Sequence, residues 1–126
     1  MNKISPLAVS HCTTLSFSFS ETLRNENVNL DNYSSYSFII DVDGTVYQGS
    51  STNDTSATVV LIGGLNKFVN SKINTLYSNF YITEQQKVTL YKIMKDLAKF
   101  TSTAKITSDN DKLDQSLNAL YNNYVG

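Results

Sequence analysis

The sequence has no tryptophan and only one cysteine, one proline and one histidine among its 126 residues. The single cysteine, Cys12, excludes an internal disulfide and any metal site built on a Cys-x-x-Cys pair. No apolar run approaches the roughly 20 residues that a membrane-spanning helix needs. The net charge of −1 comes without a basic or acidic cluster, so neither a nucleic-acid surface nor a membrane surface is indicated.

The residues that are present suit a folded domain. Hydrophobic residues make up 40% of the chain and aromatic residues 11%, which is typical of a globular protein. The length fits one domain over residues 1–126. The amino-terminal stretch MNKISPLAVSHC is too short and too polar for a secretory signal, so we expect no signal peptide.

Hydrophobic periodicity predicts an α/β domain with a mixed central sheet flanked by helices. Ser18 and Glu21 have capping-box spacing and predict a short helix over about 20–25. The Asn-rich residues 25–35 are predicted to be loop, and residues 65–80 are ambiguous. Predicted strands cover residues 7–12, 36–41, 45–48, 58–62 and 104–107.

Two longer helices have the clearest local signals. Thr83 and Gln86 form a capping box at the start of the first, which is predicted over 83–100. One apolar stripe follows it, made of Leu90, Ile93, Met94 and Leu97. A terminal amphipathic helix is predicted from a second stripe, made of Leu113, Leu117, Leu120 and Tyr124.

The stretch FIIDVDGTVYQG allows two interpretations. Its two aspartates resemble the motif of haloacid-dehalogenase-like phosphatases, in which Asp41 would be the nucleophile and Asp43 the general acid and base. However, Asp-Gly between two apolar runs is a strong signal for a β-hairpin. No crossover helix follows at once, so we interpret Asp43-Gly44 as a two-residue turn that needs a positive φ.

Four sequence blocks together resemble the zinc-dependent N-acetylmuramoyl-L-alanine amidases and peptidoglycan-recognition proteins, especially the small phage lysozyme-type amidases. The blocks are AVSHCTT, YSFIIDVDGTVYQG, TVVLIGG and YITEQQKVTLYKIMKDLAKF, and they occur in the family's order from about residue 7 to residue 100. The resemblance implies the mixed-sheet α/β fold of that family and peptidoglycan as the substrate of an active member.

The resemblance also implies a zinc site of two histidines and a third ligand, with an open fourth position. His11 matches the first ligand, at the end of a first strand, and Asp114 matches the third. Tyr36 and Lys112 match the residues that assist near the reacting carbonyl. The second histidine is absent, because the strand after the long helix reads AKITS and His11 is the only histidine.

The incomplete ligand set predicts a catalytically inactive amidase-fold protein of phage type. We expect it to act as a binding or virion structural component, without a cofactor, in a virion or in the host cytoplasm. Its partners would be virion proteins or another protein.

The alternative is an active metal-dependent amidase that degrades peptidoglycan. Asp109, Asp111 and Asp114 would then complete the zinc shell around His11.

Each candidate residue also has a structural explanation. His11 would be a hydrogen-bonded residue at a strand end and Cys12 a small buried hydrophobe. Tyr36 would be a packed hairpin aromatic, and Lys112 a solvated helix residue.

Overall fold

A computed structural model describes residues 3–4, 11–23, 29–50, 55–63, 83–108 and 111–125. The predicted strand over 7–12 and the ambiguous segment 65–80 lie mostly or wholly outside these residues. In chain order the elements are β1 (Lys3–Ile4), β2 (Thr14–Leu23), the 3-10 helix η3 (Leu30–Tyr33), β3 (Phe38–Ile40), β4 (Val46–Gln48), β5 (Ser56–Gly63), α2 (Glu84–Phe100), β6 (Lys105–Ser108) and α3 (Asp111–Tyr124).

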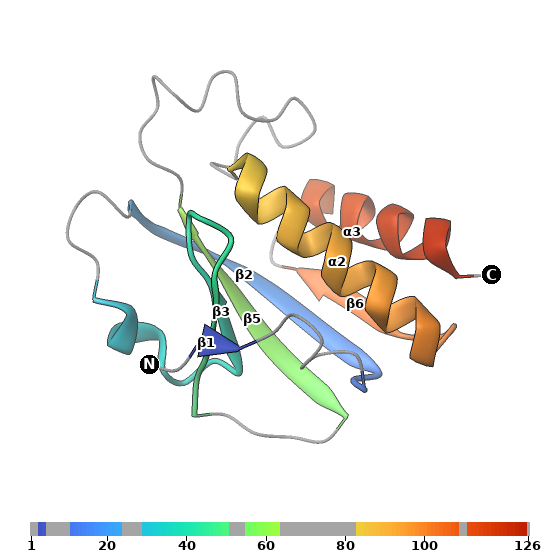
Figure 1. Cartoon of the computed structure of the whole chain (residues 1–126), viewed down its shortest axis with the longest axis horizontal. Helices are drawn as coiled ribbons and strands as arrows, with labels where there is room; N and C mark the ends of the chain where they lie inside the picture. Colours follow the sequence, from blue (N-terminus) through green and yellow to red (C-terminus); the bar gives the residue numbers. More distant parts are fainter. Residues whose placement is uncertain are drawn as a thin grey trace.

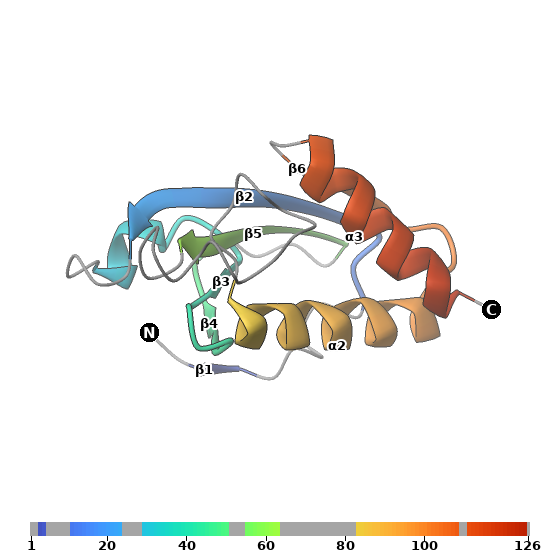
Figure 2. The same ribbon diagram turned by 90° about the horizontal axis from the view of Figure 1, so that it is seen from above.

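The strands form one six-stranded mixed sheet in the order β1-β4-β3-β5-β2-β6. β3, β5, β2 and β6 run parallel to one another, while β4 is antiparallel to both β3 and β1. Figure 1 shows β5 and β2 as the long central strands, and Figure 2 shows α2 lying along one side of the sheet with α3 beside it. The predicted α/β class with a mixed sheet and flanking helices is confirmed.

The main core lies between the sheet and the two α-helices. Leu15 and Phe17 of β2 pack in one cluster with residues of β5, β6, α2 and α3. The face of the sheet opposite these helices, called the second face here, carries a smaller cluster of Ile39, Val60 and Ile62. Because successive strand residues point to opposite faces, β5 buries apolar side chains on both, as its TVVLI sequence predicts.

The prediction of a short helix over 20–25 is wrong for residues 20–23, which belong to β2. The alternation Leu15-Ser16-Phe17-Ser18 has the two-residue period of a strand, and the pairing with β5 and β6 outweighs a local capping signal. The segment 25–35 was predicted to be loop, but it contains the helix η3 near its end. Asn29 caps this helix by accepting a 3.0 Å hydrogen bond from the backbone N–H of Asp31.

The hairpin interpretation of DVDGT is confirmed, with one correction. Asp41 N–H donates to Thr45 O, and Gly44 N–H donates to Asp41 O, both at 2.9 Å. The turn therefore has three loop residues, not two, and Gly44 at φ +84° supplies the left-handed position. Asp41 Oδ1 accepts from Val42 N–H and Asp43 Oδ1 accepts from Thr45 N–H, as turn residues do.

Both predicted long helices are confirmed. Thr83 and Gln86 form the capping box reciprocally at 3.1 Å. In α3 the buried stripe ends in Tyr121, which is 2% exposed, while the predicted Tyr124 is 39% exposed. Neither described helix is long and apolar enough to cross a membrane.

Candidate functional site

The hydroxyl side chains that line the sheet lie near the amino ends of β2 and β5, whereas open α/β sheets usually bind their ligands at the carboxyl ends of their strands. Since Leu15, Phe17 and Ile106 face the helices, alternation places Ser16, Ser18 and Thr107 on the second face. Ser16 Oγ lies 3.3 Å from Thr107 Oγ1 across β2 and β6. These are hydroxyl groups, which suit hydrogen bonding to a polar ligand but not zinc ligation.

A row of hydroxyl side chains crosses three neighbouring strands of the second face and ends just before a fourth. Ser16 is in register with Thr107 of β6 on one side and with Thr58 of β5 on the other. Ser37 follows, just before β3, with its Oγ 3.5 Å from Thr58 Oγ1. Thr58 is exposed, and Ser16 and Thr107 are half-buried. The sequence analysis did not identify this row, although the alternation in LSFSFS places its first member.

His11 lies before the amino end of β2. It occupies a turn before β2, whose first residue Thr14 pairs with the first residue of β6, Lys105. Its side chain is exposed and its ring packs on Phe100 at the end of α2, with ring centroids 4.9 Å apart. The expectation that His11 ends a first strand falls mostly on residues 7–10, which lie outside the described residues. Ser18 lies on the second face in the middle of β2.

Asp114 lies at the carboxyl end of β6. Its position follows from the hydrogen bonds of Asn118, which lies one turn later in α3. Asn118 Nδ2 donates to Ile106 O at 2.9 Å and to Asp114 O at 2.8 Å. Further along α3, Tyr121 Oη accepts from the backbone N–H of Ala104, before β6 begins. The helix therefore runs back along the strand, and the structure does not bring His11 and Asp114 together.

Tyr36 lies before β3, which is separated from β6 by β5 and β2. It is half-buried and packs against the cluster on the second face, with its ring 6.3 Å from that of Tyr33. Three strand spacings correspond to about 14 Å, so Tyr36 is not adjacent to Asp114. Lys112 belongs to the first turn of α3, and its side chain lies outside the described residues.

Cys12 is 5% exposed and belongs to the main core, which confirms the prediction of a small buried hydrophobe. Burial raises the pKa of its thiol, because the thiolate would lose its hydration. A thiol in this state is a poor nucleophile and a poor metal ligand.

A zinc site needs three protein ligands around one point. Among the described residues, no group of three or more His, Cys, Asp or Glu side chains could hold a metal ion. His11 precedes the amino end of β2, whereas Asp114 follows the carboxyl end of β6, and Asp109 lies outside the described residues. The donor set that the structure describes therefore does not fit a zinc centre.

The arrangement as a whole is similar to a solved structure, the endolysin N-acetylmuramoyl-L-alanine amidase LysCS from Clostridium intestinale URNW. The TM-score is 0.50 at 15% sequence identity, and the match covers 86% of this chain and 73% of that chain. The chain has an amidase-like fold. No protein-family model and no curated protein matches the sequence. At this level of identity the likeness concerns the amidase-like fold alone.

Proposed function

We propose that this protein binds peptidoglycan on the second face of its amidase-like sheet without hydrolysing it. The observation that carries the proposal is the separation of His11 from Asp114. His11 lies in the turn before β2 and packs on Phe100 at the end of α2, whereas Asp114 lies in the first turn of α3, after the carboxyl end of β6. This placement argues against a metal ion shared by the two side chains. A fold persists without its reaction because the core and the site depend on different residues.

The hydroxyl row supports a carbohydrate-containing ligand. Ser16, Thr58 and Thr107 present neutral groups that both donate and accept hydrogen bonds, as sugar hydroxyls and acetamido groups require. The nearby rings of Tyr33 and Tyr36 add apolar area beside the row. Such a surface binds by complementarity and needs no cofactor. The phage resemblance suggests a virion as its setting, and co-purification with capsid or tail proteins tests that part.

Co-sedimentation with purified peptidoglycan tests the binding. The double variant Ser16→Ala/Thr107→Val keeps the shape of the strands and removes two hydroxyls, so the sedimented fraction should fall. Thr103→Val, an exposed change before β6, is the matched control and should sediment like the wild type. Equal sedimentation of both variants would place binding elsewhere.

The same co-sedimentation samples test the alternative of an active amidase. Hydrolysis of the N-acetylmuramoyl-L-alanine amide frees the α-amino group of alanine, which dinitrophenylation detects. With zinc added, we expect no new amino-terminal alanine. Zinc-dependent release would favour the active amidase, with Asp111 and Asp114 as the first carboxylates to replace.

A further inference from the structure

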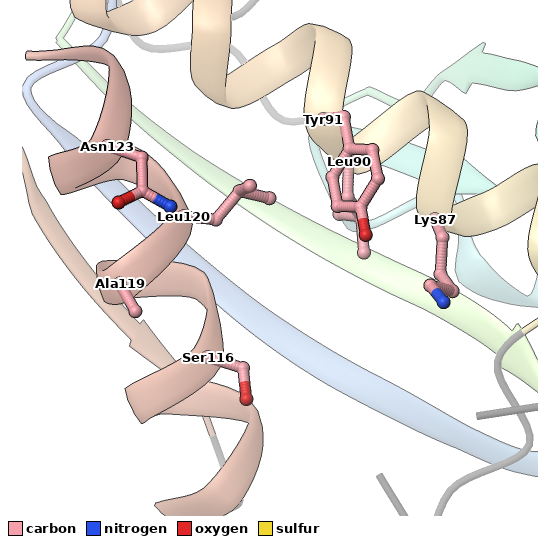
Figure 3. A pocket seen from close by; sticks show the side chains of 7 residues that line it. All are labelled: Lys87, Leu90, Tyr91, Ser116, Ala119, Leu120 and Asn123. Carbon is pink, nitrogen blue, oxygen red and sulfur yellow. The ribbon is translucent and has the colours of Figure 1, made fainter. Parts of the chain in front are cut away.

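A pocket of about 300 Å³ lies between α2 and α3, on the side of the sheet opposite the second face. Figure 3 shows Lys87, Leu90 and Tyr91 reaching it from α2 and Ser116, Leu120 and Asn123 from α3. Its volume is at the lower end of the range of about 300–1,000 Å³ for small-molecule pockets. The pocket therefore suits a ligand smaller than a disaccharide-peptide, and it is separate from the proposed peptidoglycan surface.

The interior of the pocket is apolar. Leu90 is 2% exposed and belongs to the main core, and Leu120 packs against that core from α3. Figure 3 shows Leu120 extending from α3 toward Leu90 and Tyr91. Tyr91 is 42% exposed, so part of its side chain is available to a ligand. An acyl chain or a small ring would bury apolar area here.

The charge of the pocket has one sign. Among the described residues that line it, Lys87 is the charged one and none is acidic. The Lys87 ammonium lies 3.6 Å from Glu84 Oε1, but the Glu84 side chain is 65% exposed and that of Lys87 21%. An exposed pair of this kind contributes little, so a ligand carboxylate can replace Glu84 beside the ammonium. The Ser116 hydroxyl and the Asn123 amide supply neutral hydrogen-bonding groups nearby.

We propose that the α2–α3 pocket binds a small amphipathic carboxylate, with its apolar part between Leu90 and Leu120 and its carboxylate beside Lys87. This site does not depend on the function proposed for the second face, because the two surfaces lie on opposite sides of the sheet. A carboxylate with an apolar tail fits both the apolar interior and the Lys87 ammonium.

Titration of the ¹⁵N-labelled full chain with sodium octanoate tests the proposal. We expect saturable shifts of the backbone amide signals of lining residues such as Tyr91 and Leu120. Lys87→Met should weaken the affinity about fivefold or more, because the charged partner is lost. Lys95→Met, on an exposed position of the same helix, should bind like the wild type. Octanamide has the same chain without the charge and should bind more weakly than octanoate.

A filled pocket provides the second test. Ala119 is exposed and lines the pocket, so Ala119→Trp should fill it and abolish the octanoate shifts. Asn122→Trp places the same side chain on an exposed position outside the pocket and should leave them intact. Shifts spread over the whole surface, or an equal loss in Lys87→Met and Lys95→Met, would overturn the proposal. So would octanoate binding that Ala119→Trp leaves unchanged.

Discussion

The side-chain amide of Gln86 donates a 2.9 Å hydrogen bond to the carbonyl of Ile62 at the end of β5. The same nitrogen donates to Ile40 O at the end of β3, at 3.1 Å. Gln86 is fully buried, and it lies in the first turn of α2. One side chain thus fixes the start of α2 on the carboxyl ends of two neighbouring strands.

Gln86→Leu should lower the free energy of unfolding by about 2–4 kcal/mol, because two buried carbonyls lose their donor. Urea denaturation followed by circular dichroism measures the change. Gln85→Leu is the matched control, since Gln85 is the exposed neighbour on the same helix. The role assigned to Gln86 would be wrong if both variants unfolded at the same urea concentration.

Gly44→Ala should destabilise the hairpin and its contact with α2. Gly44 has φ +84°, and a Cβ there would lie 2.6 Å from Gln85 O and 2.8 Å from Thr89 Oγ1. The left-handed backbone alone costs about 1–3 kcal/mol for a non-glycine residue in an unfavourable setting, and the crowding adds to it. Thermal unfolding checks this, with Ser35→Ala in an exposed turn as the control. An unchanged melting temperature for Gly44→Ala would contradict the described turn.

Asp43 should make the stability of the turn depend on pH. The backbone N–H of Thr45 donates to Asp43 Oδ1 at 2.9 Å and lowers the pKa of the carboxyl below its ordinary value. A lowered folded-state pKa means that the contribution is complete above the ordinary pKa of about 3.9 and is lost as pH falls through the folded value.

Denaturation of the wild type and Asp43→Ala between pH 7 and pH 2 tests this dependence. The difference should stay below about 1 kcal/mol near pH 7, because Asp43 is exposed, and it should vanish at the acid end. Asp43→Asn keeps an acceptor without the charge, so its stability relative to Asp43→Ala should not vary with pH. A difference that grows toward acid pH would reverse the sign of the argument.

Asn118 should protect the edge strand β6. Its Nδ2 occupies Ile106 O, on a strand that pairs with β2 at one edge of the sheet. Asn118→Leu frees this carbonyl for another chain, so association should increase with concentration in sedimentation velocity. Asn122→Leu, exposed on the same helix, is the control for added surface hydrophobicity. If the two variants sediment alike, the edge is protected by something other than Asn118.

The sequence predicted correctly those elements whose stabilising contacts lie within one short stretch of chain. The capping box of Thr83 and Gln86 and the apolar stripe of α2 specify a helix within one stretch of chain. The hairpin at Gly44 is equally local. Residues 20–23 were assigned wrongly because their strand state depends on pairing with β5, about 40 residues further along the chain.

The candidate site was less predictable because it depends on which residues meet across strands. The hydroxyl row needs the register of Ser16 with Thr58 and Thr107, and no single stretch contains it. His11 matched the resemblance through the string His-Cys. The strand boundaries of the structure show that this string precedes β2, so that the histidine lies away from Asp114.

Simultaneous measurement of binding and cleavage tests the central claim most directly. Purified protein is incubated with peptidoglycan and excess zinc, and the pellet is assayed for bound protein and for newly freed alanine amino groups. The account predicts bound protein, no new amino groups, and the same result for His11→Ala. Alanine released by the wild type with zinc, and lost in His11→Ala, would contradict it.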